Sequence, residues 1–451
     1  MKKVLLIGDS IRMGYCGFVK ELLANEAEVF YPEDNCKFSQ NVFVHLSWWK
    51  DLAGDPATVD VIHWNCGHWD MARWRGDDKP LNDPDAYAAM LRRIVEHMRK
   101  LMPRAKIVFA LTTPIQSDAP PLANYRDNDD VRRYNAVARA VMDELGVPVN
   151  DLFGVLEGAP ASLYADTCHL VETGYRMLAD KVAATIRAAF APPTPANLLA
   201  VASAAAKAGS AHAARERARN HEANLIATHD VKLKLDVECQ QVITKAILEA
   251  FPDHAVLGEE DTEHATPPAD AYEWIIDPID GTVNFFHGSP YWCSSVAVRR
   301  NGVVLAGCVC APDMKMLFQA SCDGPALRNG EPCHVSATDT PTLAIVHMGA
   351  DKAAKPDSQP FRFFNALTPL IQRSRICGAA ALDICLVACG AADGYFEPGI
   401  YVWDMAAADL ILRQAGGAGS VLREFGGHKL AYVASNGILH DFLRGILEPC
   451  F

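Results

Sequence analysis

WIIDPIDGTVNF, residues 274–285, joins an apolar run to a turn that carries two acidic residues. The apolar part predicts a buried strand, and Asp277 and Asp280 lie on the Pro- and Gly-bearing turn at its end. Two carboxylates held together in a poorly solvated place repel each other, so that one takes up a proton or a cation lies between them. An isolated Asp-Pro-x-Asp-Gly is usually an ordinary turn. The surrounding sequence therefore decides whether this stretch is a metal site.

The composition describes a globular protein of more than one domain. The chain has 451 residues, which is too long for one ordinary hydrophobic core, so we expect two domains. Half of the residues are hydrophobic and 22% are charged. The formal net charge of −13 argues against a nucleic-acid partner, because surfaces that follow a phosphate backbone are rich in Lys and Arg. It suits an enzyme that attracts divalent cations.

The cysteines and the N-terminus indicate where the protein works. The 14 cysteines are spread through apolar runs without metal-ligand spacing, as at Cys308, Cys310, Cys385 and Cys389. They read as reduced core residues, for which a reducing cytoplasm is the simplest setting. The apolar run near the N-terminus stops at Gly8, too early for a signal peptide or a membrane span. We therefore expect a cytoplasmic protein with no membrane partner.

The first third of the chain alternates strand-like and helical segments, which predicts a parallel sheet covered by helices. The predicted strands are Val4–Ile7, Val59–Trp64, Ile107–Leu111 and Val147–Val149, and the predicted helices are Ala86–Met102, Asp130–Leu145 and Glu172–Phe190. A stiff Pro-rich linker, residues 191–195, follows the last helix. We place the domain boundary there, with one domain at 1–191 and the other at 196–451.

The second part of the chain follows a different pattern. Its predicted helices are Ala196 to about Glu222, Val237 to about Phe251, Ala380–Cys389 and Asp404–Ala415, and its predicted strands are Ser295–Arg299, Val303–Cys310 and Met316–Ala320. Asn301-Gly302, between the first two of these strands, is a strong signal for a hairpin turn. A helix pair, an antiparallel sheet and a closing α/β part indicate a layered α+β domain.

Acidic residues gather at the predicted ends of elements in this second domain. The groups are Asp230 with Asp236 ahead of a helix, Glu259-Glu260-Asp261 after an apolar run, Asp277 with Asp280, and Asp404 at a helix N-cap. Ligand sets of oxygen alone, without His or Cys, select Mg²⁺, Mn²⁺ or Ca²⁺ over zinc. One charge run alone is usually a solvated face, but several acid groups at element ends favour a metal site.

Three motifs of this domain resemble the signatures of the inositol monophosphatase family. They are Gly258-Glu259-Glu260, Asp277-Pro278-Ile279-Asp280-Gly281-Thr282 with Asn284-Phe285, and Trp403-Asp404-Met405-Ala406-Ala407 followed by Ala415-Gly416-Gly417. They stand in the family's order, and the resemblance extends from Ala196 to Phe451. It implies a layered αβαβα sandwich, a homodimer and a phosphatase for small phosphomonoesters.

The resemblance also implies a metal centre. Glu259, Asp277 and the Ile279 carbonyl would hold one Mg²⁺, and Asp277, Asp280 and Asp404 would hold a second. A third, weaker ion would lie near Glu259, and Mn²⁺ could substitute. In phosphoryl transfer with two such ions, one ion activates the attacking water and the other stabilises the leaving oxygen.

The resemblance further implies residues that contact the substrate and the water. Gly281 and Thr282 would offer backbone N–H groups to the phosphate, at a helix N-terminus that favours anions. The Thr282 hydroxyl and Asp236 would orient and deprotonate the water. Ala379 and Glu397 would contact the substrate.

One segment departs from this family's pattern. The residues before Asp236, from His229 to Leu235, lack the threonine that is common in the family, and the family's lysine-bearing metal loop is not recognisable. Lys232 or Lys234 could take its place, and solvated strand residues are the alternative. The departure leaves the third metal ion open.

The first domain carries a different set of catalytic residue types. Its first strand ends in Gly8-Asp9-Ser10, which puts a hydroxyl at the edge of the sheet where α/β sites form. Asp166 stands three residues before His169, a spacing at which the Asp can orient the imidazole while the His takes a proton from a serine. Together they resemble the SGNH (GDSL-type) hydrolase family over Met1 to Phe190. This implies a flavodoxin-like three-layer α/β/α fold, with Ser10 as nucleophile, His169 as base and Asp166 as its orienting group.

The middle motifs of the first domain differ from that family. Asn35-Cys36-Lys37 stands where a Gly is usual, and Asn65 opens a stretch that replaces Gly-x-Asn-Asp. We assign Asn65 as the side-chain donor of the oxyanion hole, beside the Ser10 N–H, with Cys36 or its neighbour as the backbone donor. In the alternative interpretation, Asp9, Asn65 and His68 only satisfy strand ends.

We therefore expect a bifunctional hydrolase: a Mg²⁺-dependent phosphomonoesterase for a small polyol or sugar phosphate, and an SGNH-type serine esterase. In one alternative the first domain is a non-catalytic binding module, and in another the second domain is a sugar-phosphate sensor with weak turnover. Fructose bisphosphate, a 3′-phosphoadenosine nucleotide and histidinol phosphate stay open as phosphatase substrates. The expected partners are small molecules, one a phosphomonoester and one an ester.

Overall fold

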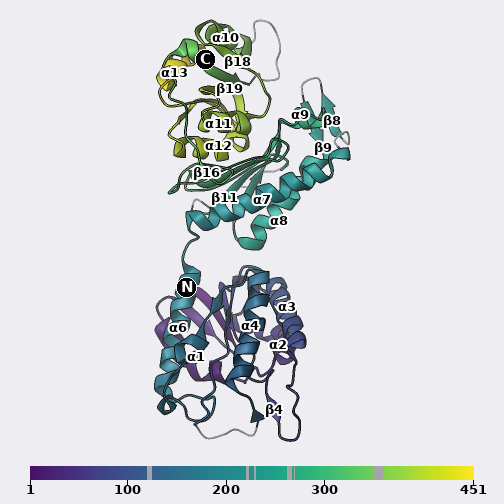
Figure 1. The fold of residues 1–451 in the computed structure, drawn as a ribbon, viewed down its shortest axis with the longest axis vertical. Coiled ribbons are helices and arrows are strands. Elements are labelled where there is room, and N and C mark those ends of the chain that lie inside the picture. The colour runs from purple at the N-terminus through teal and green to yellow at the C-terminus, as the bar shows by residue number, and fades with distance from the viewer. Residues whose placement is uncertain are drawn as a thin grey trace. The chain divides into compact units, whose positions relative to one another are not determined.

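The computed structural model describes residues 1–118, 124–219, 223–227, 230–261, 267–268, 270–349 and 359–450. The chain forms two compact units, Met1–Pro192 and Pro193–Phe451, and each has its own sheets and hydrophobic cores. Both are drawn in Figure 1. No helix among the described residues is long and apolar enough to cross a membrane.

The N-terminal unit is built on a parallel five-stranded sheet in the order β2-β1-β3-β5-β7. The strands are β1 (Lys2–Ile7), β2 (Ala27–Phe30), β3 (Val61–Trp64), β5 (Lys106–Ala110) and β7 (Val149–Asn150), with β4 (Arg73–Trp74) and β6 (Asn124–Tyr125) paired separately. This strand order is flavodoxin-like, and in such sheets sites form at the carboxyl ends of the strands. The predicted three-layer α/β/α fold is confirmed.

Helices cover both faces of this sheet (Figure 1). They are α1 (Ser10–Leu22), α2 (Ser39–Trp49), α3 (Pro84–Leu101), α4 (Asn128–Leu145), α5 (Leu152–Leu156) and α6 (Glu172–Phe190), with short 3₁₀ turns at Lys50–Ala53, Pro56–Thr58 and Ala161–Leu163. Leu5 and Ile7 share a core with residues of α2, α3 and α4, while Val4 and Leu6 share one with residues of α1 and α6. Because neighbouring side chains of a strand point to opposite faces and both faces are covered, the buried part of β1, Val4–Ile7, is apolar without interruption.

The described residues of the C-terminal unit form two large sheets and one two-stranded sheet. One is β10-β11-β12-β13-β14-β15-β16, formed by Ala255–Gly258, Tyr272–Asp280, Cys293–Arg300, Val303–Ala311, Met316–Ser321, Leu327–Arg328 and Glu331–Pro332. The other is β18-β17-β19-β21-β20, formed by Arg373–Arg375, Ile345–Met348, Gly394–Tyr401, Lys429–Ser435 and Ala418–Gly426. A separate pair consists of β8 (Ala223–Ala227) and β9 (Asp230–Leu233). Only the β10–β11 pair is parallel in the first sheet, so the predicted antiparallel meander is present.

Helices lie in three layers around these sheets. They are α7 (Pro195–Arg215), α8 (Lys234–Ala250), α9 (Thr282–Phe286), α10 (Gln359–Leu367), α11 (Ala380–Ala388), α12 (Val402–Gln414) and α13 (His440–Leu447), with 3₁₀ turns at Arg217–Arg219, Pro341–Leu343, Thr368–Leu370 and Glu448–Cys450. Apolar residues of α7 and α8 pack on the outer face of the seven-stranded sheet, and those of α11 and α12 lie between the sheets. Residues of α10 and α13 cover the far face of the five-stranded sheet. The predicted αβαβα sandwich is confirmed.

Two acidic residues lie deeper inside their helices than predicted. Helix α8 begins at Lys234, so Asp236 is in its first turn and not ahead of it. Asp404 is the third residue of α12 and not its N-cap, which is Tyr401. The Oδ2 atom of Asp404 accepts a hydrogen bond from the Tyr401 backbone N–H at 2.9 Å, and this reciprocal capping starts the helix before Asp404.

A buried histidine in the five-stranded parallel sheet of the N-terminal unit predicts that this unit loses stability in acid. His63 on β3 is fully buried, its Nε2 lies 3.0 Å from Nδ2 of Asn150, and the Tyr15 ring packs edge-on against it. Burial lowers the pKa of His63 from 6.5 to about 3. A histidine with a depressed pKa stabilises the fold fully above pH 6.5, and this stabilisation is lost as pH falls toward 3, because only the unfolded chain takes up the proton.

We expect the first unit to lose on the order of 4 kcal/mol of unfolding free energy between pH 6.5 and 3 through this group. Hydrogen exchange of peptides from β3, followed by mass spectrometry in the whole protein, measures the loss. His63→Gln keeps an acceptor for Asn150 and cannot take up the proton, so its peptides should show a flatter pH dependence. Equal slopes for the two proteins would contradict the assignment.

Candidate active sites

Three carboxylates converge in the C-terminal unit. Glu259 follows β10, Asp277 lies near the end of β11, and Asp404 lies in the first turn of α12. One oxygen from each of the three lies within 4.8 Å of the others. The ladder between β11 and β12 is irregular between Asp277 and Asp280, so Pro278 and Ile279 form a local bulge. The segment 274–285 thus delivers Asp277 to this cluster from the end of a buried strand, whereas Asp280 is not one of the three converging carboxylates.

Burial and mutual repulsion dominate the electrostatics of this cluster. Burial raises the pKa of Asp277 well above its usual range, and the carboxylates of Glu259 and Asp280 raise it further. Asp404 is affected in the same way, by burial first and then by Glu259 and Asp280. Ionising the whole set without a countercharge would be costly.

Asp280 is held by the start of helix α11. Its Oδ1 accepts the Ala380 backbone N–H at 3.0 Å, and its Oδ2 accepts the Ala381 N–H at 2.8 Å. The Cys293 thiol donates to the same carboxylate at 3.4 Å. Burial raises the pKa of Asp280 to about 6 although these hydrogen bonds oppose the change. The carboxylate is therefore fixed in position and orientation.

The turn after Asp280 is shaped by a glycine. Gly281 has φ +89°, and a Cβ there would lie 3.1 Å from Ala379 Cβ and from two backbone oxygens, so both the conformation and the space favour glycine. The Thr282 hydroxyl donates to the Ile279 carbonyl at 3.0 Å. Thr282 is the first residue of α9, which has five residues. The helix at whose N-terminus a phosphate site was predicted is therefore short.

The remaining predicted residues of this unit surround the cluster. Asp236 is buried, and its charge contributes to the raised pKa of Asp277. Ala379 is 1% exposed and its side chain belongs to the core, which leaves only its backbone to meet a substrate. Glu397 lies on β19, where its Oε2 accepts the Tyr395 hydroxyl at 3.0 Å and lies close against Gly349. The two other residues of the predicted acidic run make local hydrogen bonds: the Asp261 carboxylate accepts the Gly258 N–H, and the Glu260 backbone N–H donates to the Gln240 side chain.

The departure before Asp236 lies at the edge of the described part of the chain. His229 is outside the described residues. Asp230 and Lys232 lie on β9, for which the backbone is described and the side chains are not. The predictions that concern a lysine-bearing loop and a third ion stay predictions.

The residues present fit a hard divalent cation. The donor set consists of carboxylate oxygens that lie near one another, which is the chemistry that Mg²⁺ and Mn²⁺ prefer. The raised pKa values of Asp277 and Asp404 have their cause in burial and in repulsion, and a cation would relieve the repulsion.

The N-terminal unit contains a serine, a histidine and an aspartate in a hydrogen-bonded row. Ser10 is the first residue of α1, and only Gly8 and Asp9 separate it from the carboxyl end of β1. Its Oγ lies 2.8 Å from Nε2 of His169, and the Nδ1 of His169 lies 2.6 Å from Oδ2 of Asp166. The other oxygen of Asp166 accepts the backbone N–H groups of His169 and Cys168. The two ring nitrogens face different partners, which is the arrangement of a proton relay.

The charge of Asp166 suits that arrangement. Burial alone would raise the pKa of Asp166, but hydrogen bonds from His169 and Cys168 outweigh it and hold the pKa below its usual range. An ionised carboxylate at Nδ1 fixes the tautomer in which Nε2 can accept the serine proton.

Asn65, the predicted side-chain donor, lies against Gly8, two residues before the serine. It follows β3, is 4% exposed, and its backbone N–H donates to the Ile7 carbonyl at 3.0 Å. A Cβ on Gly8 would lie 1.9 Å from Asn65 Oδ1, so Gly8 leaves room for this side chain. The neighbouring Asp9 is also buried, and burial raises the pKa of its carboxyl group.

The expected backbone donor from Cys36 is already engaged. The Cys36 N–H donates to the Gly8 carbonyl at 3.1 Å, and the Lys37 N–H donates to the Asn35 side chain at 2.8 Å. In this conformation neither the Cys36 N–H nor the Lys37 N–H is free to serve an oxyanion hole, which contradicts the prediction for Cys36 itself. The geometry leaves Ser10 and Asn65 as the candidate donors.

Two buried arginines near this site were not predicted. Arg12 is 1% exposed, and it donates to the carbonyls of Pro32, Asp34 and Gly8, which fastens the loop before Cys36 to the end of β1. Arg126 is 9% exposed and donates to the His68 carbonyl at 2.9 Å. The burial of Arg12 could have been predicted from its position, because it lies two residues after Ser10 in the first turn of a helix that packs against the sheet.

His68 is a structural residue and not a second base. Its Nε2 lies 3.0 Å from the Thr113 hydroxyl, and its ring is buried. Burial lowers the pKa of His68 well below its usual range, and the charges of Arg126 and His169 lower it further. His68 therefore stays neutral, which agrees with the alternative interpretation that this residue only satisfies a strand end.

We expect Gly8→Ala to impair this site. The added Cβ would meet Asn65 Oδ1 and the Arg12 side chain, so the Asn65 amide must move; removing a donor of this kind lowers kcat by about 100-fold. Overpacking should also cost about 1–3 kcal/mol of unfolding free energy. Gly17→Ala is the matched control, because a Cβ there meets nothing within 4 Å and lies inside α1. Ester hydrolysis and thermal unfolding of both variants check the difference, and equal behaviour would contradict it.

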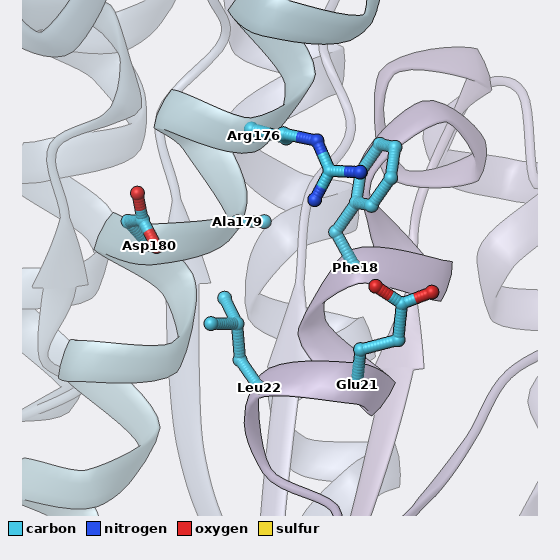
Figure 2. A pocket seen from close by; sticks show the side chains of 6 residues that line it. All are labelled: Phe18, Glu21, Leu22, Arg176, Ala179 and Asp180. Atoms are coloured by element: carbon cyan, nitrogen blue, oxygen red, sulfur yellow. The ribbon is translucent and has the colours of Figure 1, made fainter.

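A surface groove of this unit lies away from the row of catalytic residue types. It is lined by Phe18, Glu21, Leu22, Arg176, Ala179 and Asp180, and Figure 2 shows these side chains between α1 and α6. The Arg176 guanidinium stacks over the Phe18 ring at 4.2 Å. None of Ser10, Asp166 and His169 lines the groove, so it is not the place where an ester would react.

The fold and the acidic cluster of the C-terminal unit define a phosphoric monoester hydrolase. Residues 195–444 match the family model described as inositol monophosphatase family, and this match spans more than half of the chain. The chain therefore belongs to the inositol monophosphatase family. Residues 6–177 match the GDSL-like lipase/acylhydrolase family, so the N-terminal unit is a GDSL-like hydrolase domain. Both resemblances expected from the motifs are confirmed.

Similar proteins agree with this assignment. An inositol monophosphatase of Dictyostelium discoideum is 35% identical over 192 residues, which cover 42% of this chain and 71% of the relative. The Nus factor SuhB of Pasteurella multocida is 34% identical over 255 residues, 55% of this chain and 94% of the relative. The chloroplastic phosphatase IMPL1 of Arabidopsis thaliana is 34% identical over 292 residues, 62% of this chain and 75% of the relative.

Solved structures show the same fold for the C-terminal part. The inositol monophosphatase of Anabaena is 32% identical, with a TM-score of 0.50, and the match covers 56% of this chain and 96% of that one. The extragenic suppressor protein suhB of Bartonella henselae is 27% identical, with a TM-score of 0.51, and the match covers 55% of this chain and 97% of that one.

Proposed function

We propose that the C-terminal unit is a Mg²⁺-dependent phosphomonoesterase that acts on a small polyol or sugar phosphate. The observation that carries the proposal is the convergence of Glu259, Asp277 and Asp404 oxygens within 4.8 Å, in a chain that belongs to the inositol monophosphatase family. Relatives named as inositol monophosphatases support the substrate class.

In this proposal Glu259, Asp277 and the Ile279 carbonyl hold one divalent ion, and Asp277, Asp280 and Asp404 hold another. When bound, the ions supply Lewis-acid chemistry that polarises the phosphate ester and offsets the charge on the leaving oxygen. The N–H groups of Ala380 and Ala381 keep the Asp280 carboxylate in place for this role.

The chain's own groups handle the water and the phosphate. The Thr282 hydroxyl donates a hydrogen bond to the Ile279 carbonyl, so the lone pairs of its oxygen can accept a hydrogen bond from the attacking water. Buried Asp236 would take the water's proton. The N–H groups of Gly281 and Thr282 would bind phosphate oxygens, since the first N–H groups of a helix lack an intrahelical acceptor. The Glu397 carboxylate would accept hydrogen bonds from substrate hydroxyls.

The test is phosphate release from a panel of purified phosphomonoesters with Mg²⁺, with Mn²⁺ and with EDTA. The panel contains an inositol monophosphate, fructose bisphosphate, a 3′-phosphoadenosine nucleotide and histidinol phosphate. We expect a metal-dependent rate that is highest on the polyol or sugar esters. A rate unchanged in EDTA would contradict the proposal, and a preference for the nucleotide or histidinol phosphate would change the substrate class.

We also propose that the N-terminal unit is a serine esterase with Ser10 as nucleophile, His169 as base and Asp166 as the orienting group. The supporting observation is the row of hydrogen bonds at 2.8 and 2.6 Å in which each ring nitrogen of His169 faces a different partner. Ser10 N–H and the Asn65 amide would stabilise the oxyanion. In the competing function, a non-catalytic binding module, hydrolysis of p-nitrophenyl acetate would be absent.

A further inference from the structure

A second cluster of reactive side chain types lies in the C-terminal unit, apart from the carboxylates. His347 is on β17, Cys377 precedes α11, and Asp383 is in the first turn of α11. The Nδ1 atom of His347 lies 2.5 Å from Oδ1 of Asp383 and 3.8 Å from the Sγ of Cys377. One atom from each residue lies within 4.8 Å of the other two. His347 and Asp383 are buried, and Cys377 is half-buried, so the cluster is open to solvent on one side.

This arrangement is not a proton relay. In a relay, the nucleophile and the carboxylate face opposite nitrogens of the imidazole, as Ser10 and Asp166 do at His169. Here the thiol and the carboxylate both face Nδ1 of His347, so the ring cannot pass a proton from one to the other. A ring nitrogen, a thiol sulfur and a carboxylate oxygen instead gather around one region of space, and they can act as ligands of a metal ion once the nitrogen and the sulfur have lost their protons.

The three ligand types select a different cation from the carboxylate cluster. Thiolate, imidazole and carboxylate together are a zinc donor set, whereas Mg²⁺ prefers oxygen alone. In tetrahedral zinc sites, bonds of about 2.0–2.3 Å put neighbouring ligand atoms about 3.3–3.7 Å apart. The Sγ to Nδ1 distance of 3.8 Å is already close to this, and the hydrogen bond between His347 and Asp383 would open by about 1 Å.

The surroundings hold the carboxylate in place. The Tyr291 hydroxyl donates a hydrogen bond to Oδ1 of Asp383, the outer-shell contact that orients ligating carboxylates. We propose that His347, Cys377 and Asp383 form a Zn²⁺ site in this unit, with water as the fourth ligand. Binding displaces the Nδ1 proton and the thiol proton to solvent, and no electron is transferred.

An ion at this site would brace the loop that leads into α11. The Asn284 side chain donates to the carbonyl of Cys377 at 2.8 Å, and the Ala380 N–H holds Asp280. Zinc would link β17 to this loop through Cys377. Cys377 lies three residues before Ala380, whose N–H binds the Asp280 carboxylate. Its expected effect in the absence of substrate is a higher melting temperature, because a ligand that binds only the folded chain stabilises it.

The test uses the full chain with excess Mg²⁺, so that the carboxylate cluster is saturated. Zn²⁺ is titrated by calorimetry, and Co²⁺ is added as a spectroscopic probe, because thiolate ligation gives an intense charge-transfer absorption. We expect one Zn²⁺ per chain beyond Mg²⁺, a Co²⁺ thiolate band, and a raised melting temperature. Cys377→Ser should remove the band and weaken Zn²⁺ binding at least 100-fold.

Two cysteine controls separate this site from others. Cys389→Ser changes a half-buried thiol at the far end of the same helix, and Cys168→Ser changes the thiol beside His169; both should keep the Co²⁺ band. His347→Gln gives a second ligand variant if Cys377→Ser folds poorly, and circular dichroism monitors folding. The proposal is overturned if the wild type shows no thiolate band, or if the band survives Cys377→Ser, or if only Cys168→Ser removes it. These outcomes are independent of phosphatase activity.

Discussion

Asp277→Asn should reduce Mg²⁺-dependent phosphate release by about 1,000-fold or more. Asp277 is the one carboxylate proposed to bind both divalent ions, so the substitution removes a charged ligand from both sites. Because the two ions act together in the reaction, weakening both is expected to abolish most of the activity. Asparagine keeps the shape and can still accept the Ile279 N–H that Asp277 Oδ1 accepts at 3.0 Å. Phosphate release at saturating Mg²⁺ measures the effect.

The same substitution should stabilise the metal-free protein, which separates the electrostatic effect from damage to the fold. Burial and the nearby Glu259 and Asp280 raise the pKa of Asp277, so the ionised carboxylate destabilises the folded state when no cation is present. At pH 8 in EDTA the variant should melt at a higher temperature than the wild type, and Mg²⁺ should raise its melting temperature less. Asp253→Asn, at an exposed position, is the control and should change neither quantity. Undiminished activity of Asp277→Asn, or lower stability in EDTA, would contradict the assignment.

The fold could be predicted where periodicity and turn chemistry agree. Asn301 and Gly302 have φ of +52° and +78°, as a tight hairpin between β12 and β13 requires, and the sequence Asn-Gly predicts this directly. Strand β2 and helix α2 were not predicted. The strand has four residues, and the helix exposes Val44 and Trp48, which obscures its apolar face.

The acids and the row of Ser10, His169 and Asp166 could be predicted because they belong to recognisable motifs, and most of the acids and Ser10 also lie near the ends of elements. The engagement of Cys36 by the Gly8 carbonyl could not, since a backbone hydrogen bond between distant segments leaves no mark on composition or spacing. The cluster of His347, Cys377 and Asp383 was missed for the same reason. Its members come from separate parts of the chain: His347 on β17 pairs with Arg375 of β18, Cys377 follows β18, and Asp383 is on α11.

Ser10→Ala should lower hydrolysis of p-nitrophenyl acetate by about 10,000-fold, to the level of any residual background. The Ser10 Oγ is the atom that His169 Nε2 faces at 2.8 Å, and no other described hydroxyl is hydrogen-bonded to that ring. Phosphate release should be unchanged, because Ser10 lies in the N-terminal unit and the acidic cluster lies in the other.

A fluorophosphonate probe makes this test independent of the natural ester. It reacts with an activated serine whatever acyl group the site accepts, so it should label the wild type and leave Ser10→Ala unlabelled. Ser162→Ala changes an exposed serine of the same unit and should label like the wild type. His169→Asn should lose labelling as well, since Ser10 then has no base. Equal labelling of wild type and Ser10→Ala, or none in either, would favour the binding-module function, because hydrogen bonds that only stabilise a strand end do not make a serine nucleophilic.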